Sequence, residues 1–236
     1  MAELRAVLFD LDGTITDSAP IIRRTMAGLM RDWAGIDRPL EAYSKYVGPP
    51  LEDTFAQLGV PAEHIDTFVV EYRRRYDEHL GETTLFDGVV DVLRQVRAQG
   101  LGIAIATSKW ETVAKAVLDI LGVSDLIDTI CGSLPDGSRK HKHEVIAHAL
   151  DQLTELGFID DADRLETVPL GTRISERDVR HDLIMVGDRD FDTFGAAVHG
   201  IRTVLVSWGE GNSAEAKRAW KYVTSSAELT HALLNN

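Results

Sequence analysis

Cysteine is almost absent from this sequence, and it lacks any hydrophobic run of membrane-spanning length. Cys131 is the only cysteine in 236 residues, so no disulfide can form within the chain, as is usual in the reducing cytoplasm, where we expect this protein. No segment approaches the ~18 apolar residues that span a membrane. The apolar run that starts at Ala6 stops at Asp10, which argues against a secretory signal peptide.

Basic side chains are also in the minority. The chain has 25 Lys and Arg against 38 Asp and Glu, which gives a formal net charge of -13. Such an acidic surface repels phosphate backbones and anionic lipids, so we expect neither a nucleic acid nor a membrane as partner. Hydrophobic residues make up 44% of the chain, enough for one large domain or two modest ones. We expect a monomer or homodimer that acts on a small molecule.

Several short apolar runs have the composition of strands that are buried on both faces. They are Ala6–Phe9, Gly102–Ala106, Leu183–Val186 and Thr203–Val206, with Ile127–Cys131 as a weaker candidate. Between them, apolar residues recur at helical spacing, as in segments 89–96 and 113–121. Alternating strands and helices are typical of a parallel sheet covered by helices. The sequence therefore predicts an α/β fold with a Rossmann-like parallel sheet.

Residues 17–82 interrupt this alternation. They contain apolar residues at helical spacing in segments 21–30 and 65–76, and no convincing strand. A segment of this length is long for one crossover between strands. We therefore expect an all-helical module, called here the cap segment, inserted into an α/β core formed by residues 1–16 and 83–236. The alternative is that these helices simply cover the sheet.

Polar side chains follow three of the predicted strands at the points where they end. They are Asp10 and Asp12, Thr107 and Ser108, and Asp188 and Asp192. Because the carboxyl ends of parallel strands meet at one edge of a sheet, we expect these residues to form one site. Clustered aspartates suit a hard cation, and Mg²⁺ fits best. Hydroxyls and backbone N–H groups at a helix start, as we expect at 107–108, suit a phosphate.

Four sequence motifs resemble those of the haloacid dehalogenase superfamily in its phosphatase form. DLDGTITDS at 10–18 resembles the first motif, and Thr107-Ser108-Lys109 the second. The lysine-bearing segment 138–150 resembles the third, and VGDRDFD at 186–192 the fourth. The nearest subgroup is phosphoglycolate phosphatase-like. The resemblance implies a Rossmann-like core with a helical cap, and a Mg²⁺-dependent phosphatase that hydrolyses a small phosphorylated metabolite through an aspartyl-phosphate.

The resemblance also implies roles for the residues of the first two motifs. Asp10 is expected to be the nucleophile and a metal ligand. Asp12 is expected to be the general acid/base, with its backbone carbonyl on the metal. Gly13 would let the backbone approach the phosphate, whose oxygens Thr107 and Ser108 would hold.

In the last two motifs, the resemblance assigns Asp188 and Asp192 to Mg²⁺, and one lysine to both the phosphate and Asp10. That lysine is either Lys142 or Lys140, because the segment lacks the commoner KPxP form of the motif. The KxEVI form of the subgroup favours Lys142, whereas ungapped spacing favours Lys140. We choose Lys142 as the catalytic lysine.

Other activities remain open on the same core. Asp12 argues against a true dehalogenase, which lacks this second carboxylate. A 5′-nucleotidase or a phosphosugar mutase would use the same aspartates, and a catalytically inactive binding or regulatory protein is a distant alternative. Arg23, Arg24, Lys45 and Tyr46 are plausible contacts to substrate from the cap segment. The chain also has extra residues at 158–182, which we interpret as a surface excursion, with an oligomer contact or a regulatory surface as the alternative.

Overall fold

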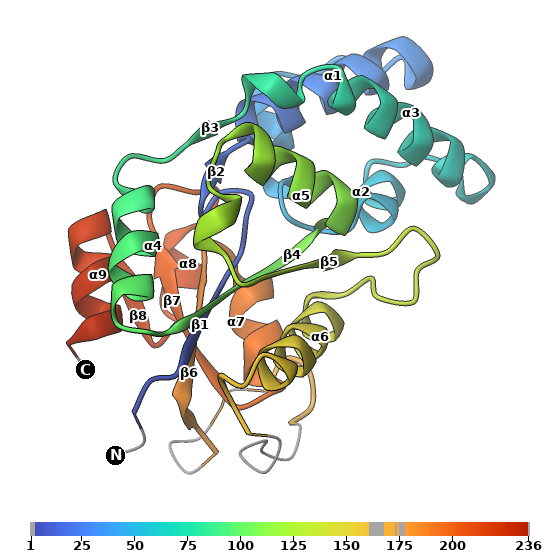
Figure 1. Cartoon of the computed structure of the whole chain (residues 1–236). Helices are drawn as coiled ribbons and strands as arrows, with labels where there is room; N and C mark the ends of the chain where they lie inside the picture. The colour runs from blue at the N-terminus through green and yellow to red at the C-terminus, as the bar shows by residue number, and fades with distance from the viewer. Residues whose placement is uncertain (1–2, 161–167, 173, 175–177, 236) are drawn as a thin grey trace.

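Strand β1 (Ala6–Phe9) lies inside a six-stranded sheet in the computed structural model, which describes residues 3–160, 168–172, 174 and 178–235 (Figure 1). Its neighbours are β4 (Gly102–Trp110) and β6 (Arg180–Gly187), and both pairings are parallel. The order across the sheet is β5-β4-β1-β6-β7-β8. The predicted α/β fold is confirmed, and the carboxyl ends of β1 and β6 lie side by side.

The other core elements follow the predicted alternation. The strands are β5 (Thr129–Ser133), β7 (Ile201–Val206) and β8 (Lys221–Val223). The helices are α4 (Val89–Ala98), α5 (Glu111–Ile120), α6 (Lys142–Glu155), α7 (Asp190–Ala197), α8 (Ser213–Ala216) and α9 (Ser226–Leu234). Side chains of α4, α5 and α9 form one hydrophobic cluster with the sheet, and those of α6 and α7 form a second. Both faces of the central strands are thus covered, which explains their unbroken apolar runs.

The cap segment contains helices α1 (Ala19–Ala34), α2 (Leu51–Gln57) and α3 (Ile65–Asp77), which Figure 1 shows above the sheet. Pro20 lies in the first turn of α1, where its missing N–H costs nothing, and Gly35 ends the helix with a φ of 67°. The apolar sides of these helices form a third hydrophobic cluster around Met26 and Phe55. That the cap segment is a separate module, with boundaries at 16/17 and 82/83, stays a prediction.

Two very short strands lie where the chain enters and leaves the cap segment. β2 (Thr16–Asp17) pairs antiparallel with β3 (Thr84–Leu85), so that Asp17 lies opposite Thr84. Strands of two residues carry no periodicity, and the sequence therefore does not reveal them. Their pairing places the two connections to the cap segment side by side.

Some boundaries differ from those predicted. β4 continues past Ala106 to Trp110, because its pairing with β5 resumes after an irregularity, with Trp110 opposite Ser133. Thr107 and Ser108 therefore lie at the end of a strand and not, as the sequence suggested, at the start of a helix. The following helix, α5, begins only at Glu111.

The extra segment predicted at 158–182 falls partly outside the described residues, at 161–167, 173 and 175–177. At its start Phe158 packs against the second core cluster, and at its end Arg180 begins β6. In the described part of the chain, no helix combines the length and the apolar character that crossing a membrane requires.

Candidate active site

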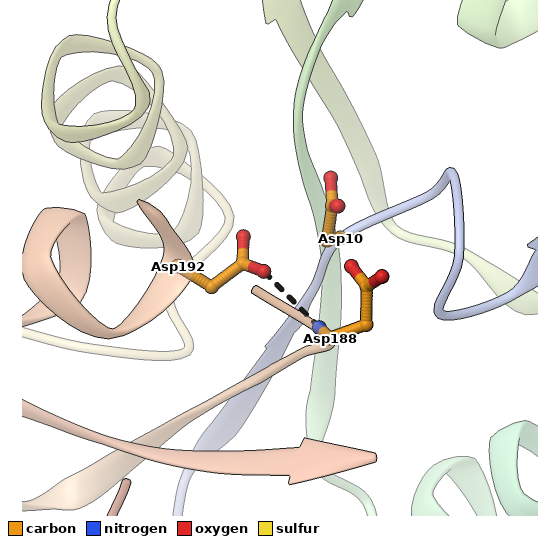
Figure 2. A group of neighbouring side chains, drawn as sticks. All are labelled: Asp10, Asp188 and Asp192. Atoms are coloured by element: carbon orange, nitrogen blue, oxygen red, sulfur yellow. Dashed lines mark hydrogen bonds between the residues drawn. The ribbon is translucent and has the colours of Figure 1, made fainter. Parts of the chain in front are cut away.

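Three aspartates meet where β1 and β6 end. Asp10 follows β1 directly, and its N–H donates to the carbonyl of Val186 in β6 at 2.8 Å. Asp188 follows the end of β6, and Asp192 lies in the first turn of α7. Asp192 Oδ2 accepts from the Asp188 N–H at 3.1 Å, which fixes its side chain against the strand end (Figure 2). The predicted metal ligands Asp10, Asp188 and Asp192 are therefore brought together by neighbouring elements.

The three carboxylates form a buried, strongly acidic cluster. One oxygen of each lies within 4.8 Å of one oxygen of the other two. Burial raises the pKa of Asp10 to about 6, although the ammonium of Lys142 opposes this shift. Burial, followed by the charges of Asp192 and Asp10, raises the pKa of Asp188 well above its ordinary value. The cluster is thus poised to take up positive charge.

Lys142 supplies part of that charge. It is the first residue of α6, and its ammonium lies 2.7 Å from Asp10 Oδ1 and 2.8 Å from Asp192 Oδ1. The same ammonium also donates a hydrogen bond to the backbone carbonyl of Ala106 at 3.0 Å. Lys140, the alternative left open by the sequence, instead pairs with Asp53 of the cap segment at 2.8 Å. The geometry thus separates the two lysines and places Lys142 at the aspartates.

The residues of this cluster fit a divalent cation. Three carboxylates against one ammonium leave two negative charges uncompensated. Asp188 Oδ1 is buried and has no hydrogen-bond partner among the described residues, as expected of an oxygen kept for a cation. An all-oxygen set of carboxylates is the donor set that Mg²⁺ and similar hard cations prefer.

Gly13 lies against Asp188, and Thr107 lies in β4. Gly13 has a φ of 84°, and a Cβ there would lie 2.4 Å from Asp188 Oδ2, so a side chain would collide with a metal-site residue. Thr107 is buried, and its Oγ1 accepts from the Lys109 N–H at 3.2 Å. Ser108 lines a cavity between the core and the cap segment.

Asp12 lies outside the aspartate cluster. Its Oδ1 accepts from the Ser18 hydroxyl at 2.5 Å, and its Oδ2 lies 3.1 Å from the ammonium of Lys109. Its carboxylate is therefore not part of the group formed by Asp10, Asp188 and Asp192. Sequence reasoning missed Ser18 and Lys109 as its partners. Both stand within the quoted motifs, but nothing in the sequence shows that their side chains turn toward Asp12.

A cavity of about 130 Å³ lies between the core and the cap segment. The core contributes Asp12, Ser108, Lys109 and Trp110, and α3 contributes Tyr72, Arg73 and Tyr76. The Arg73 guanidinium stacks 3.3 Å from the centre of the Trp110 ring, which joins the two parts. The cavity thus lies between the two parts, with Asp12 in its wall.

The four residues of the cap segment suggested as substrate contacts lie in different surroundings. Tyr46 lines the cavity. Arg24 instead pairs with Glu82 at 2.5 Å, and Arg23 donates to the Ser44 hydroxyl at 3.0 Å. Lys45 lies 4.8 Å from the centre of the Tyr46 ring. Only Arg23 and Arg24 lie on α1, whereas Lys45 and Tyr46 lie in a separate 3-10 helix, Leu40–Tyr46. Helical spacing alone could not tell which of these side chains face the core, because that depends on how both elements pack on it.

Residues 7–206 match the sequence pattern of the haloacid dehalogenase-like hydrolase family. The tyrosine-protein kinase PtkA of Mycobacterium tuberculosis is 36% identical over 96% of this chain and 68% of that protein. A 5′-nucleotidase of Pseudomonas aeruginosa is 31% identical over 89% of this chain and 86% of that protein. The crystal structure of a predicted phosphatase from Clostridium acetobutylicum is 29% identical, with a TM-score of 0.83 over 99% of this chain and 100% of the other. The chain belongs to the haloacid dehalogenase-like hydrolases and is a phosphatase of that family.

Proposed function

We propose that this protein is a Mg²⁺-dependent phosphatase that hydrolyses a small phosphate monoester through an aspartyl-phosphate at Asp10. The observation that carries the proposal is the buried set of Asp10, Asp188 and Asp192 beside the Lys142 ammonium. Asp10, Asp188 and Asp192, with the backbone carbonyl of Asp12, would hold the cation. When bound, it would neutralise the phosphoryl oxygens and so permit an anion to be attacked by a carboxylate.

The proposed reaction has two steps. In the first, an Asp10 carboxylate oxygen bonds to phosphorus, the bond from phosphorus to the leaving oxygen breaks, and Asp12 gives that oxygen a proton. In the second, a water attacks phosphorus while Asp12 takes its proton, and the bond to Asp10 breaks, which releases phosphate. Lys142 stabilises the charge on the phosphoryl oxygens, and Thr107 and Ser108 orient them.

Two substrate classes follow from different observations. The first motif and the cap segment resemble those of phosphoglycolate phosphatases, so 2-phosphoglycolate is the first candidate. A 5′-nucleotide is the second, because the wall of the cavity is partly aromatic, with Tyr46, Tyr72, Tyr76 and Trp110, and such a wall suits a base. The relative named as a 5′-nucleotidase supports this second candidate.

Phosphate release from a panel of monoesters tests the proposal. The panel contains 2-phosphoglycolate, 5′-nucleotides, hexose phosphates and p-nitrophenyl phosphate, each with Mg²⁺ and with a chelator. We expect phosphate release with Mg²⁺ and loss of nearly all activity with the chelator. The monoester that is hydrolysed with the highest kcat/KM identifies the substrate class. Activity unchanged by the chelator would contradict the metal requirement. If no compound releases phosphate, transfer of labelled phosphate to a sugar would favour a mutase. Transfer to a protein tyrosine would favour a kinase such as the one the PtkA name describes.

The pH dependence of stability gives an independent test of the aspartate cluster. The pKa of Asp10 is raised from 3.8 to about 6 in the folded protein, so the folded state binds more protons than the unfolded state between these values. Asp10 therefore contributes stability below about pH 4 that is lost as the pH rises through about 6, by up to about 3 kcal/mol.

The measurement is urea unfolding with chelator at several pH values between 4 and 8, on the wild type and on Asp10→Asn. The wild type should lose stability relative to Asp10→Asn as the pH rises, and added Mg²⁺ should restore more stability at pH 7.5 than at pH 5. A difference between the two proteins that does not change with pH would show that the Asp10 carboxyl is not perturbed.

A further inference from the structure

Both oxygens of the Asp12 carboxylate are held, and neither is held by the aspartate cluster. Oδ1 accepts from the Ser18 hydroxyl at 2.5 Å, and Oδ2 lies 3.1 Å from Lys109 Nζ. The Lys109 side chain is only 9% exposed and that of Asp12 only 12%, so water screens the pair weakly. A carboxylate with both oxygens engaged is fixed in one orientation, which a group that transfers a proton requires.

Lys109 is itself held by the cap segment. Its ammonium donates to the Tyr76 hydroxyl at 2.8 Å and lies 4.2 Å from the centre of the Tyr76 ring. Tyr76 lies in α3, is 4% exposed, and stacks on Tyr72 with ring centres 6.0 Å apart. One buried ammonium therefore joins Asp12, in the core, to a helix of the cap segment.

The ammonium faces an anion on one side and a hydroxyl on the other, because Asp12 Oδ2 lies 3.1 Å and the Tyr76 hydroxyl 2.8 Å from Lys109 Nζ. Asp12, Lys109 and Tyr76 also line the same cavity. Without the Tyr76 contact, Lys109 would keep its ion pair with Asp12 but lose the group that fixes its ammonium against the cap segment. Asp12 Oδ2 would then be held by a more mobile side chain.

We propose that Lys109 is a positioning residue that, held by Tyr76, aims the Asp12 carboxyl at the leaving oxygen when the cap segment rests on the core. The proposal depends on the proposed function, in which Asp12 gives a proton to that oxygen. It extends the function by naming the pair of residues that connects proton transfer to the position of the cap segment.

The dependence of the rate on the leaving group tests the proposal. An alkyl monoester needs a proton on its leaving oxygen, whereas p-nitrophenyl phosphate expels a stable phenolate without one. Lys109→Met removes the charge and keeps the length of the side chain. We expect it to lower kcat/KM about 10²- to 10³-fold for the preferred alkyl monoester and less than about 10-fold for p-nitrophenyl phosphate. Lys115→Met, at an exposed lysine on α5, is the matched control and should leave both values unchanged.

Tyr76→Phe tests the link to the cap segment, and covers the case in which Lys109→Met does not fold. It removes only the hydroxyl and keeps the ring. We expect the same selective loss for the alkyl monoester, about 5- to 50-fold in kcat/KM, because Lys109 keeps its charge but loses its anchor. The double variant should be no worse than Lys109→Met alone, since both changes break one connection.

Equal losses on the two substrates in either variant would overturn the proposal and assign Lys109 a structural role. Losses that multiply in the double variant would overturn the link through Tyr76. Wild-type activity in the same assays separates these failures from failure of the proposed function. If the wild type releases phosphate only with Mg²⁺, and Asp10→Asn releases none, the proposed function is supported whatever the activity of Lys109→Met.

Discussion

Replacing Asp10 by asparagine is expected to abolish phosphate release, with a fall in kcat of at least about 10⁴-fold. The amide cannot attack phosphorus, and no other carboxylate in the described site occupies its place at the end of β1. Asp188 and Asp192 would hold the cation in the proposed mechanism, and Asp12 is turned toward Ser18 and Lys109. The measurement is release of phosphate from the preferred monoester, with acid quenching of a labelled substrate to detect protein-bound phosphate in the wild type.

A folding defect would not explain this loss. Asparagine nearly matches aspartate in volume, and it removes one of three mutually repelling carboxylates. We therefore expect Asp10→Asn to unfold at the same or a higher urea concentration than the wild type at pH 7.5 with chelator. Full activity in Asp10→Asn would show that the nucleophile lies elsewhere, and would remove the basis of the proposed mechanism.

Replacing Lys142 by methionine is expected to have the second largest effect. Its ammonium is the buried positive group that contacts both Asp10 and Asp192, so its loss removes charge stabilisation from the transition state. We expect kcat to fall by about 10²- to 10⁴-fold. Because a buried ion pair is broken from one side, unfolding with chelator should also become easier by roughly 3–5 kcal/mol.

Lys140→Met is the matched control for this prediction. Lys140 is the nearest lysine in sequence. It lines the cavity and pairs with Asp53 at 2.8 Å. An ion pair of this exposure contributes about 1 kcal/mol or less, so the variant should keep most of the activity on small substrates. The reverse outcome, with Lys140→Met inactive and Lys142→Met active, would show that the lysine of the third motif was assigned to the wrong residue.

Much of the core could be predicted because it depends on short-range patterns. β1 and the end of β6 are buried on both faces, and this requirement produces apolar runs that end in polar residues. The aspartates at those ends follow from the topology, because parallel neighbours bring their carboxyl ends together. Asp10, Asp188 and Asp192 could therefore be grouped from the amino-acid sequence alone.

The features that escaped prediction depend on contacts between distant segments. β8 is an edge strand of three residues with a half-exposed Tyr222, and it has no apolar run. Lys142 could be chosen from the sequence through the KxEVI form, but the contacts that separate it from Lys140 appear only once α6 lies beside β4. Lys109 meets Tyr76 only after the cap segment has packed on the core, and no local pattern encodes that contact.

The pairing of β2 with β3 has a consequence for how such a protein can evolve. Because Asp17 lies opposite Thr84, the chain leaves and re-enters the core at one place, and everything between can change without moving the ends of the core strands. The hydrophobic clusters follow the same partition, since the buried members of the cap cluster come from residues 19–76 and those of the two core clusters from outside them. Selection can thus exchange the helices of the cap segment, by insertion, deletion or recombination, while the aspartates at the ends of β1 and β6 keep their places.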